Sequence, residues 1–330
     1  MKKIFLILSV FAVVFTSCET DFDVNAEWDE VTVVYGFLDA GEEMNTQQIK
    51  ISKAFLGKMD ALQMAQYADS INFDQGDLAV KVIRVKNNGN TDTITLDEVP
   101  ILRASGIFNN SIMMYTFENT FEDKPFLNSN SEYELLIKNN LTGNQVSSIT
   151  NIVSNFNFDM GAGFPFGFIE TWIPGNSSAT KFSDQRVSWG NSNDNGLQYQ
   201  IDLIFNYQEN NIDKDLIYTT SVLEGTSQFA FEGEKFFNFL KNELVKDPSI
   251  ERKFIDIDLV MTVGSEDLKT YRIINEEITG IVQERPQFTN INNGIGLFSS
   301  RFTKTRKGFS IANRTIDYLI SIDGLDRNFQ

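Results

Sequence analysis

Two aspartates, Asp256 and Asp258, lie at alternate positions of the stretch KFIDIDLVMTV at 253–263. Alternate residues of a strand share a face and lie about 7 Å apart, so the two carboxylates could serve as the acid and base of a glycoside hydrolase. The alternative is an exposed strand face whose charges prevent edge pairing. Because the chain has 45 acidic residues, such a pair arises readily by chance, and we favour the structural interpretation.

The composition limits the other kinds of catalytic and metal chemistry. The chain has no histidine and one cysteine, which excludes histidine-based triads, histidine general bases and zinc sites built from these ligands. A calcium loop is a further candidate, at the EF-hand-like spacing of Asn191, Asn193, Asn195, Gly196 and Asp202. Its low charge favours a plain hairpin turn instead. We therefore expect no enzyme activity, no metal and no cofactor.

Aromatic rings gather in the segment FNFDMGAGFPFGFIETWIPG at 156–175. Phe164, Phe166, Phe168 and Trp172 could form an aromatic surface that contacts a glycan or another nutrient. The alternative is that these rings pack in a core or between two domains. We favour packing, because buried aromatic side chains are common and exposed aromatic patches are rare.

The first residues have the layout of a secretory signal peptide. Lys2 and Lys3 precede the run IFLILSVFAVVF at 4–15, which is apolar except for Ser9. This run is too short for a membrane-spanning helix, which needs about 20 residues, and small polar residues follow it. We therefore predict a signal peptide over residues 1–17.

Cys18, the single cysteine, comes directly after Thr16 and Ser17. A cysteine in this position resembles the lipobox of bacterial lipoproteins, although residue 15 is Phe where the common lipobox has leucine. The resemblance implies that the thiol is acylated and that cleavage makes this cysteine the new N-terminus. We favour lipidation at Cys18 over an incidental cysteine near the end of an ordinary signal, and we expect an acidic tether over 18–27.

The formal net charge of −17 limits the partners of the chain. Nucleic acid binding needs clustered lysines and arginines, and the dense basic run RFTKTRKGF at 301–309 is better explained as a solvated strand or loop face. The acidic body also repels anionic lipid headgroups, so membrane association is expected through acyl chains at the N-terminus. We predict an outer-membrane location, on its periplasmic or its surface-exposed face.

Residues 28–153 have the pattern of an immunoglobulin-like β-sandwich. Short alternating strands are expected at 28–38 and 46–55. Two hairpins are expected at 78–99 and 131–152, because the Asn and Gly residues of their turns accept positive φ at low cost. This half of the chain is therefore predicted to be built from strands and polar turns.

Residues 154–330 are predicted to form a β-rich second domain, a fibronectin type III-like sandwich with α+β elaboration. The stretch 185–209 resembles the B–C region of such a sandwich. Apolar residues at helical spacing predict two helices, at 233–247 and 265–278. Further strands are expected at 253–263, 294–302 and 315–322.

Several parts of the chain resemble the DUF4249-like group of Bacteroidetes lipoproteins. They are the signal with Cys18, the stretch VVYGFLDAGEEMNTQQIKISKAFLG at 33–57, the helix–strand–helix pattern of 233–278, and QFTNINNGIGLFSSR at 287–301. The resemblance implies a β-rich fold and association with a SusC-like TonB-dependent outer-membrane transporter. It implies no catalytic residue.

These observations predict a lipid-anchored, non-enzymatic protein of the cell envelope that binds a partner. The expected partner is a SusC-like transporter or another envelope protein. One alternative is a surface module that binds a glycan or nutrient through the aromatic segment. The other is a histidine-free hydrolase that uses Asp256 and Asp258.

Overall fold

The computed structural model describes residues 31–41, 43–54, 71–102, 111–160, 164–176, 179–190, 195–276 and 287–330. The predicted signal peptide, Cys18 and the predicted tether lie outside these residues, as do Asn191 and Asn193 of the candidate calcium loop, whereas Asp202 of that candidate lies within the strand β14. Among the helices of the described ranges, none has the length and apolar character needed to cross a membrane.

The fold is mainly β and of the β-sandwich type, as the sequence predicts. Its largest layer is a nine-stranded sheet with the strand order β15-β14-β18-β19-β1-β2-β6-β5, in which β16 also pairs with β14. The strands of this sheet are β1 (Thr32–Asp39), β2 (Thr46–Lys53), β5 (Asp97–Leu102), β6 (Ser111–Glu118), β14 (Gln198–Glu209), β15 (Ile212–Thr219), β16 (Leu223–Glu224), β18 (Arg252–Gly264) and β19 (Ile295–Phe309).

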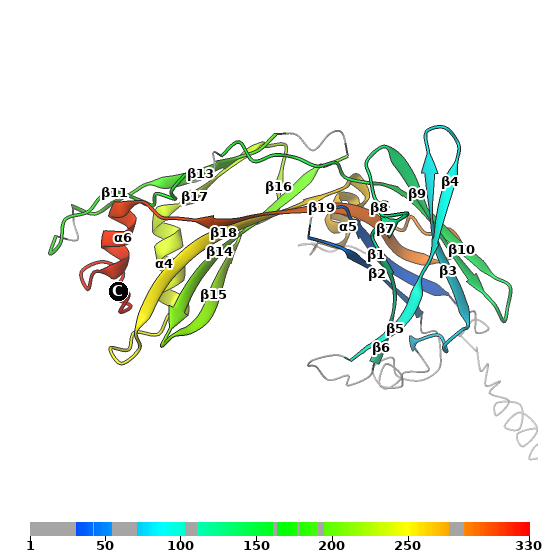
Figure 1. Ribbon diagram of the computed structural model, residues 1–330, viewed down its shortest axis with the longest axis horizontal. Helices are drawn as coiled ribbons and strands as arrows, with labels where there is room; N and C mark the ends of the chain where they lie inside the picture. Colours follow the sequence, from blue (N-terminus) through cyan, green and yellow to red (C-terminus); the bar gives the residue numbers. More distant parts are fainter. Residues whose placement is uncertain are drawn as a thin grey trace, which may run out of the picture.

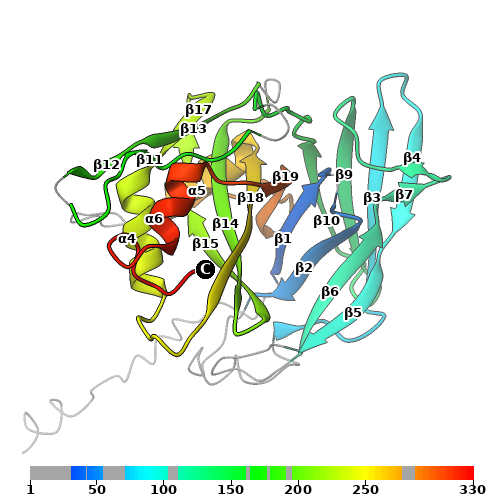
Figure 2. The ribbon, with the colours of Figure 1, turned by 60° about the vertical axis from the view of Figure 1, so that its left-hand side comes forward.

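Smaller sheets and three helices pack around the large sheet (Figure 2). A four-stranded sheet in the order β10-β9-β3-β4 contains β3 (Leu78–Lys86), β4 (Thr91–Thr95), β9 (Ser131–Asn139) and β10 (Gln145–Asn151). The two-stranded pairs are β7 (Thr120–Phe121) with β8 (Lys124–Pro125), β11 (Ile169–Thr171) with β12 (Lys181–Phe182), and β13 (Asp184–Ser188) with β17 (Gln228–Glu232). The helices of the described residues are α4 (Gly233–Glu243), α5 (Glu266–Asn275) and α6 (Asn313–Ile320).

The long strand β19 connects the two halves of the molecule (Figure 1). Its first part pairs in parallel with β1, from Ile295 opposite Val33 to Arg301 opposite Asp39. Its second part pairs in antiparallel fashion with β18. The nine-stranded sheet therefore continues across the two halves of the sequence that meet near residue 154.

Two apolar cores lie on one face of this sheet. The N-terminal core fills the space between the nine-stranded and four-stranded sheets, and the C-terminal core packs beneath α4 and α6. Phe298 belongs to the N-terminal core and Phe302 to the C-terminal core. Because side chains four residues apart on a strand share a face, both cores cover the same face of β19.

The two hairpins predicted from Asn and Gly residues are confirmed. β3 and β4 flank Gly89, which has a φ of 83°, and β9 and β10 flank Gly143, which has a φ of 78°. Glycine adopts this left-handed backbone without the steric cost that a Cβ would bring. Local turn chemistry thus determined where these strands end.

Two of the observed helices were predicted from the sequence, and the third was not. α4 buries Phe236, Phe237 and Leu240, the face expected from their spacing, and α5 occupies most of 265–278. The strand predicted at 315–322 is wrong, because this stretch forms α6, so the described residues of the C-terminal part include a third helix where two were predicted. Its apolar residues fit both a strand and a helix, and the C-terminal core selects the helix by burying Tyr318 and Leu319.

Candidate functional site

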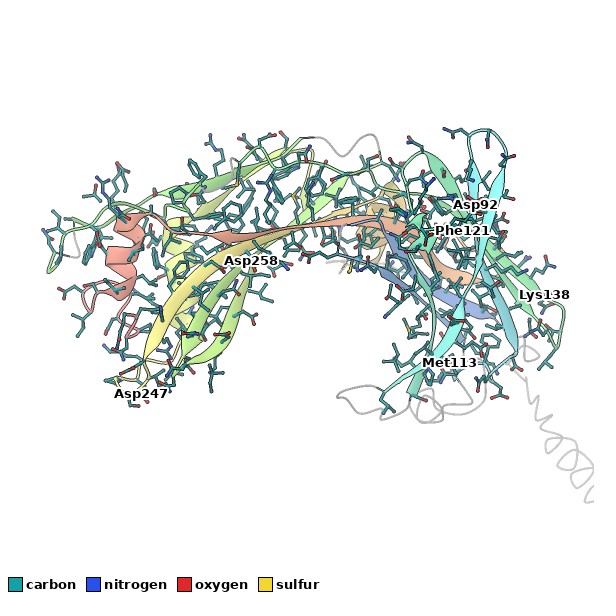
Figure 3. All side chains as sticks on the ribbon, in the orientation of Figure 1. Asp92, Met113, Phe121, Lys138, Asp247 and Asp258 are labelled. Atoms are coloured by element: carbon teal, nitrogen blue, oxygen red, sulfur yellow. The ribbon has the colours of Figure 1, made fainter. Side chains whose placement is uncertain are left out.

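The face of the nine-stranded sheet opposite the two cores is the candidate site, and we call it the open face. Along β14, Ile201, Leu203 and Phe205 are buried in the C-terminal core, whereas Ile204 and Asn206 between and beyond them are only partly buried. The same alternation continues through β18 and through β19 from Ser300 to Thr305. Figures 1 and 3 show that the molecule is arched and that the open face, with Asp258 on it, lies on the concave side.

The predicted aspartate pair lies on this open face, as the alternation of β18 indicates. Asn206 on β14 donates hydrogen bonds from Nδ2 to Asp256 Oδ1 at 2.8 Å and to Asp258 Oδ2 at 3.1 Å. The backbone N–H of Gly308 donates to Asp258 Oδ1 at 2.9 Å. Both carboxylates are therefore held in place by neighbours on a charged strand face. The expected role of blocking edge pairing is wrong, because β18 pairs with β14 on one side and β19 on the other.

Further carboxylates extend this part of the open face. Asp215 and Asp213 on β15 pair in register with Asn206 and Gln208, and Asp202 lies further along β14. Within the part of the chain that the structure describes, no cluster of three acidic or cysteine side chains could hold a metal ion. The five aspartates of this region, which we call the acidic strip, are Asp202, Asp213, Asp215, Asp256 and Asp258.

A small cavity lies near the middle of the open face, where β14, β18, β19 and β1 come together. Its volume is about 220 Å³. Three of its walls are apolar, formed by Phe37, Val222 and Leu268. The other residues that line it are Gln198, Tyr199, Gln200, Thr262, Gly264 and Arg301. We call it the central pocket.

Buried polar contacts fix the shape of the central pocket. Arg301 Nε donates to Asp39 Oδ2 at 2.9 Å, and Asp39 also accepts hydrogen bonds from the N–H groups of Gly41 and Thr303. The side chain of Asp39 is only 3% exposed, so this carboxylate holds Arg301 firmly against the sheet. The pocket wall is therefore preorganised before any ligand arrives.

Helix α5 borders the central pocket and is held to the sheet mainly by polar contacts. Ser265 Oγ hydrogen-bonds Ser299 Oγ rather than capping the helix, and Tyr271 Oη donates to Tyr35 Oη at 3.2 Å. Asp267 Oδ2 accepts from Asn290 Nδ2 at 3.0 Å. Burial raises the pKa of the Asp267 carboxyl above its ordinary range.

Replacing Asp267 by asparagine is expected to stabilise the protein at neutral pH. Because the folded state raises the pKa of Asp267, its stabilising contribution is present below the unfolded-state value of about 4 and is lost as the pH rises through the folded-state pKa. The asparagine side chain stays neutral and can still accept a hydrogen bond from Asn290. Melting temperatures measured between pH 4 and pH 8 should therefore diverge in favour of the variant as pH rises.

The control for this prediction is Asp92→Asn, which should behave in the opposite way. Hydrogen bonds from Lys86 and Arg84 lower the pKa of Asp92 in the folded protein. Its stabilising contribution is therefore present above the unfolded-state pKa and is lost as pH falls through the folded-state value. If Asp267→Asn had a lower melting temperature than the native protein at pH 8, burial would not be what raises the pKa of Asp267.

The four aromatic residues singled out in the sequence do not form one surface. Phe166 and Phe168 are fully buried in the C-terminal core, where Phe168 stacks on Phe236 with ring centroids 4.2 Å apart. Trp172 is half-buried against this core, and Phe164 is 55% exposed. Packing, the interpretation favoured above, thus accounts for the two central rings of the segment.

Sequence reasoning missed the residues of the central pocket. Phe37 and Arg301 are far apart in the chain and become neighbours only because β1 and β19 pair in parallel. Leu268 joins them because α5 folds back over the sheet. No motif or local spacing in the sequence predicts that these three residues lie close together, so only the tertiary structure shows it.

Comparisons with known proteins add no family. No protein-family model matches the chain, and no curated protein matches its sequence. One solved structure titled a cytokine receptor complex has a TM-score of 0.23 and 12% identity, over 71% of this chain and 92% of its own. A second of that description has a TM-score of 0.22 and 11% identity, over 86% and 99%. Likenesses of this size support no argument about function.

Proposed function

We propose that the protein is a lipid-anchored, non-enzymatic protein of the bacterial outer membrane that binds a partner protein. The observation that carries the proposal is the open face, on which a preorganised pocket lies next to the acidic strip. Ile217 is 51% exposed on β15, and Ile295 is 43% exposed on β19. These two side chains lie on opposite sides of the central pocket, and a preorganised pocket flanked by exposed apolar and charged side chains on one face is typical of a binding site.

The anchor in this proposal comes from the sequence. The charged start, the short apolar run and Cys18 together favour acylation at the thiol. Two or more acyl chains would hold the protein firmly at the membrane, whereas its charge of −17 opposes direct contact with anionic headgroups. The resemblance to DUF4249-like lipoproteins suggests a SusC-like TonB-dependent transporter as the partner.

The other two candidate functions have less support. Phe166 and Phe168 are buried in the core, so they cannot contact a glycan or nutrient at the surface of the aromatic segment. Hydrolysis by Asp256 and Asp258 would use carboxylates that already accept hydrogen bonds from Asn206, and Asp258 also accepts one from Gly308. Partner binding at the open face is therefore the function that the geometry favours.

Replacing Cys18 by alanine is expected to abolish acylation. Native protein and variant would be expressed in their bacterial host with radiolabelled palmitate, followed by separation of the membranes. Label should appear on the native protein alone, in the outer-membrane fraction, because the thiol is the acceptor of the acyl chain. Equal labelling of both proteins, or none on either, would contradict the proposed anchor.

The partner is tested in the same preparation. Affinity-tagged native protein purified from solubilised outer membranes should retain a stoichiometric protein partner, with a TonB-dependent transporter as the expected identity. A preparation that contains only the tagged protein after mild cross-linking would contradict partner binding, even where lipidation is found.

A further inference from the structure

The order of apolar, concave and charged regions on the open face indicates the chemistry of what it binds. Tyr35 on β1 and Val99 on β5 lie on it in the N-terminal half, 37% and 38% exposed. The central pocket follows, and the acidic strip lies beyond it in the C-terminal half. An apolar region, a pocket and a charged region thus follow one another across one sheet.

The size of the central pocket indicates what can enter it. Pockets for whole small molecules usually measure about 300–1,000 Å³, and this one measures about 220 Å³. That volume suits one large apolar side chain, which Phe37, Val222 and Leu268 would contact. Interfaces between proteins are commonly anchored by such a side chain in a pocket of the partner.

The acidic strip determines the charge of the occupant. Three lysines lie in the same region: Lys214 and Lys307 line it beside the aspartates, and Lys253 pairs in register with Gln208. Lys214 already pairs with Glu209, and Lys307 with Glu43 at 3.1 Å. The strip is thus negative overall and favours a cationic segment. A second copy of this chain, with its own net charge of −17, would be repelled.

The distance between pocket and strip sets the length of the occupant. Gln200 borders the pocket, and Asn206 lies among the aspartates, both on β14. Six residues of strand span about 20 Å, so an extended segment of about six or seven residues reaches both.

We infer that the open face docks an extended, lysine- or arginine-bearing segment of a partner protein, with one large apolar side chain of that segment in the central pocket. This inference rests on the proposed function and specifies its binding surface. Aspartates attract and align the segment, and the apolar side chain in the pocket adds affinity and fixes the position of the segment.

The test uses a fluorescein-labelled peptide that begins with one phenylalanine and continues with lysines at alternate positions over the next six or seven residues, and a second peptide with serine in place of the phenylalanine. Binding to the native protein is measured by fluorescence anisotropy at low and moderate salt. The phenylalanine peptide should bind about ten-fold more tightly than the serine peptide, the range expected for one anchoring side chain. Added salt should weaken both.

Two variants probe the surface, each with a matched control. Gln200→Trp fills the pocket from an exposed position, and Gln228→Trp places the same ring at an exposed position of β17. Asp215→Lys reverses a charge of the strip, and Asp184→Lys does so at an exposed position of β13. Gln200→Trp should remove the preference for phenylalanine, and Asp215→Lys should weaken both peptides, whereas the controls should bind as the native protein does.

A phenylalanine preference that survives Gln200→Trp, or equal binding by Asp215→Lys and Asp184→Lys, would overturn the inference. So would a native protein that binds neither peptide. The same variants separate this inference from the proposed function. If the variants still retain the partner that the native protein retains from membranes, the binding surface inferred here is wrong and the proposed function stands. If the native protein retains no partner, the proposed function itself is wrong.

Discussion

Replacing Phe168 by alanine is expected to lower the free energy of unfolding by about 3–5 kcal/mol, the usual cost of removing a buried phenylalanine ring. Phe168 is fully buried, stacks on Phe236 and lies edge-on to Phe237, so the variant leaves a cavity at the centre of the C-terminal core. Urea denaturation followed by circular dichroism measures the loss as a lower midpoint with an unchanged slope.

The control for this prediction is Phe164→Ala in the same segment. Phe164 is 55% exposed, and a surface truncation of this kind changes stability by less than about 0.5 kcal/mol. The pair of variants separates packing from ligand contact within one aromatic run. Equal, small losses in both variants would show that the core does not depend on Phe168.

Replacing Gly296 by alanine is expected to cost about 2–5 kcal/mol, because a side chain at positive φ costs about 1–2 kcal/mol and overpacking about 1–3 kcal/mol. Gly296 has a φ of 116°, and a Cβ there would lie 2.0 Å from the backbone oxygen of Val34. Gly296 also pairs with Val34 at the parallel contact of β1 and β19. The variant should therefore loosen the join between the two halves of the sheet.

Gly89→Ala is the matched control for the glycine prediction. Gly89 also has a positive φ, 83°, but a Cβ there would meet no atom within 4 Å. Its replacement should cost only the backbone strain of about 1–2 kcal/mol. Chemical denaturation of both variants gives the comparison. Equal losses in the free energy of unfolding would show that the close contact with Val34 adds no cost at Gly296.

Local patterns in the sequence were sufficient for much of the fold. Asn and Gly turns located the β3–β4 and β9–β10 hairpins, and alternation located β14 and β18. The apolar spacing of α4 gave its buried face. Each of these features depends on residues within one turn or one strand, so the determining interactions are short-range.

The stretch that forms α6 shows where local reasoning ends. Ile316, Tyr318 and Ile320 alternate as in a strand, and Thr315, Tyr318 and Leu319 share a helical face. Intrinsic preference does not choose between these patterns. The edge contacts of Tyr318 with Trp172 and Phe182, and its contact with Phe237, favour the helix, because only a helix buries Tyr318 and Leu319 together.

The sequence by itself determined that the fold is rich in β-strands, that its charge disfavours nucleic acid and that histidine chemistry is excluded. It also predicted an acylated Cys18. Composition and local spacing are enough for each of these statements. The tertiary structure alone decided that β19 joins both halves in one sheet and that Phe37, Leu268 and Arg301 line one pocket. Strand pairing between residues this far apart depends on how two cores pack against the same strand, which no local pattern records.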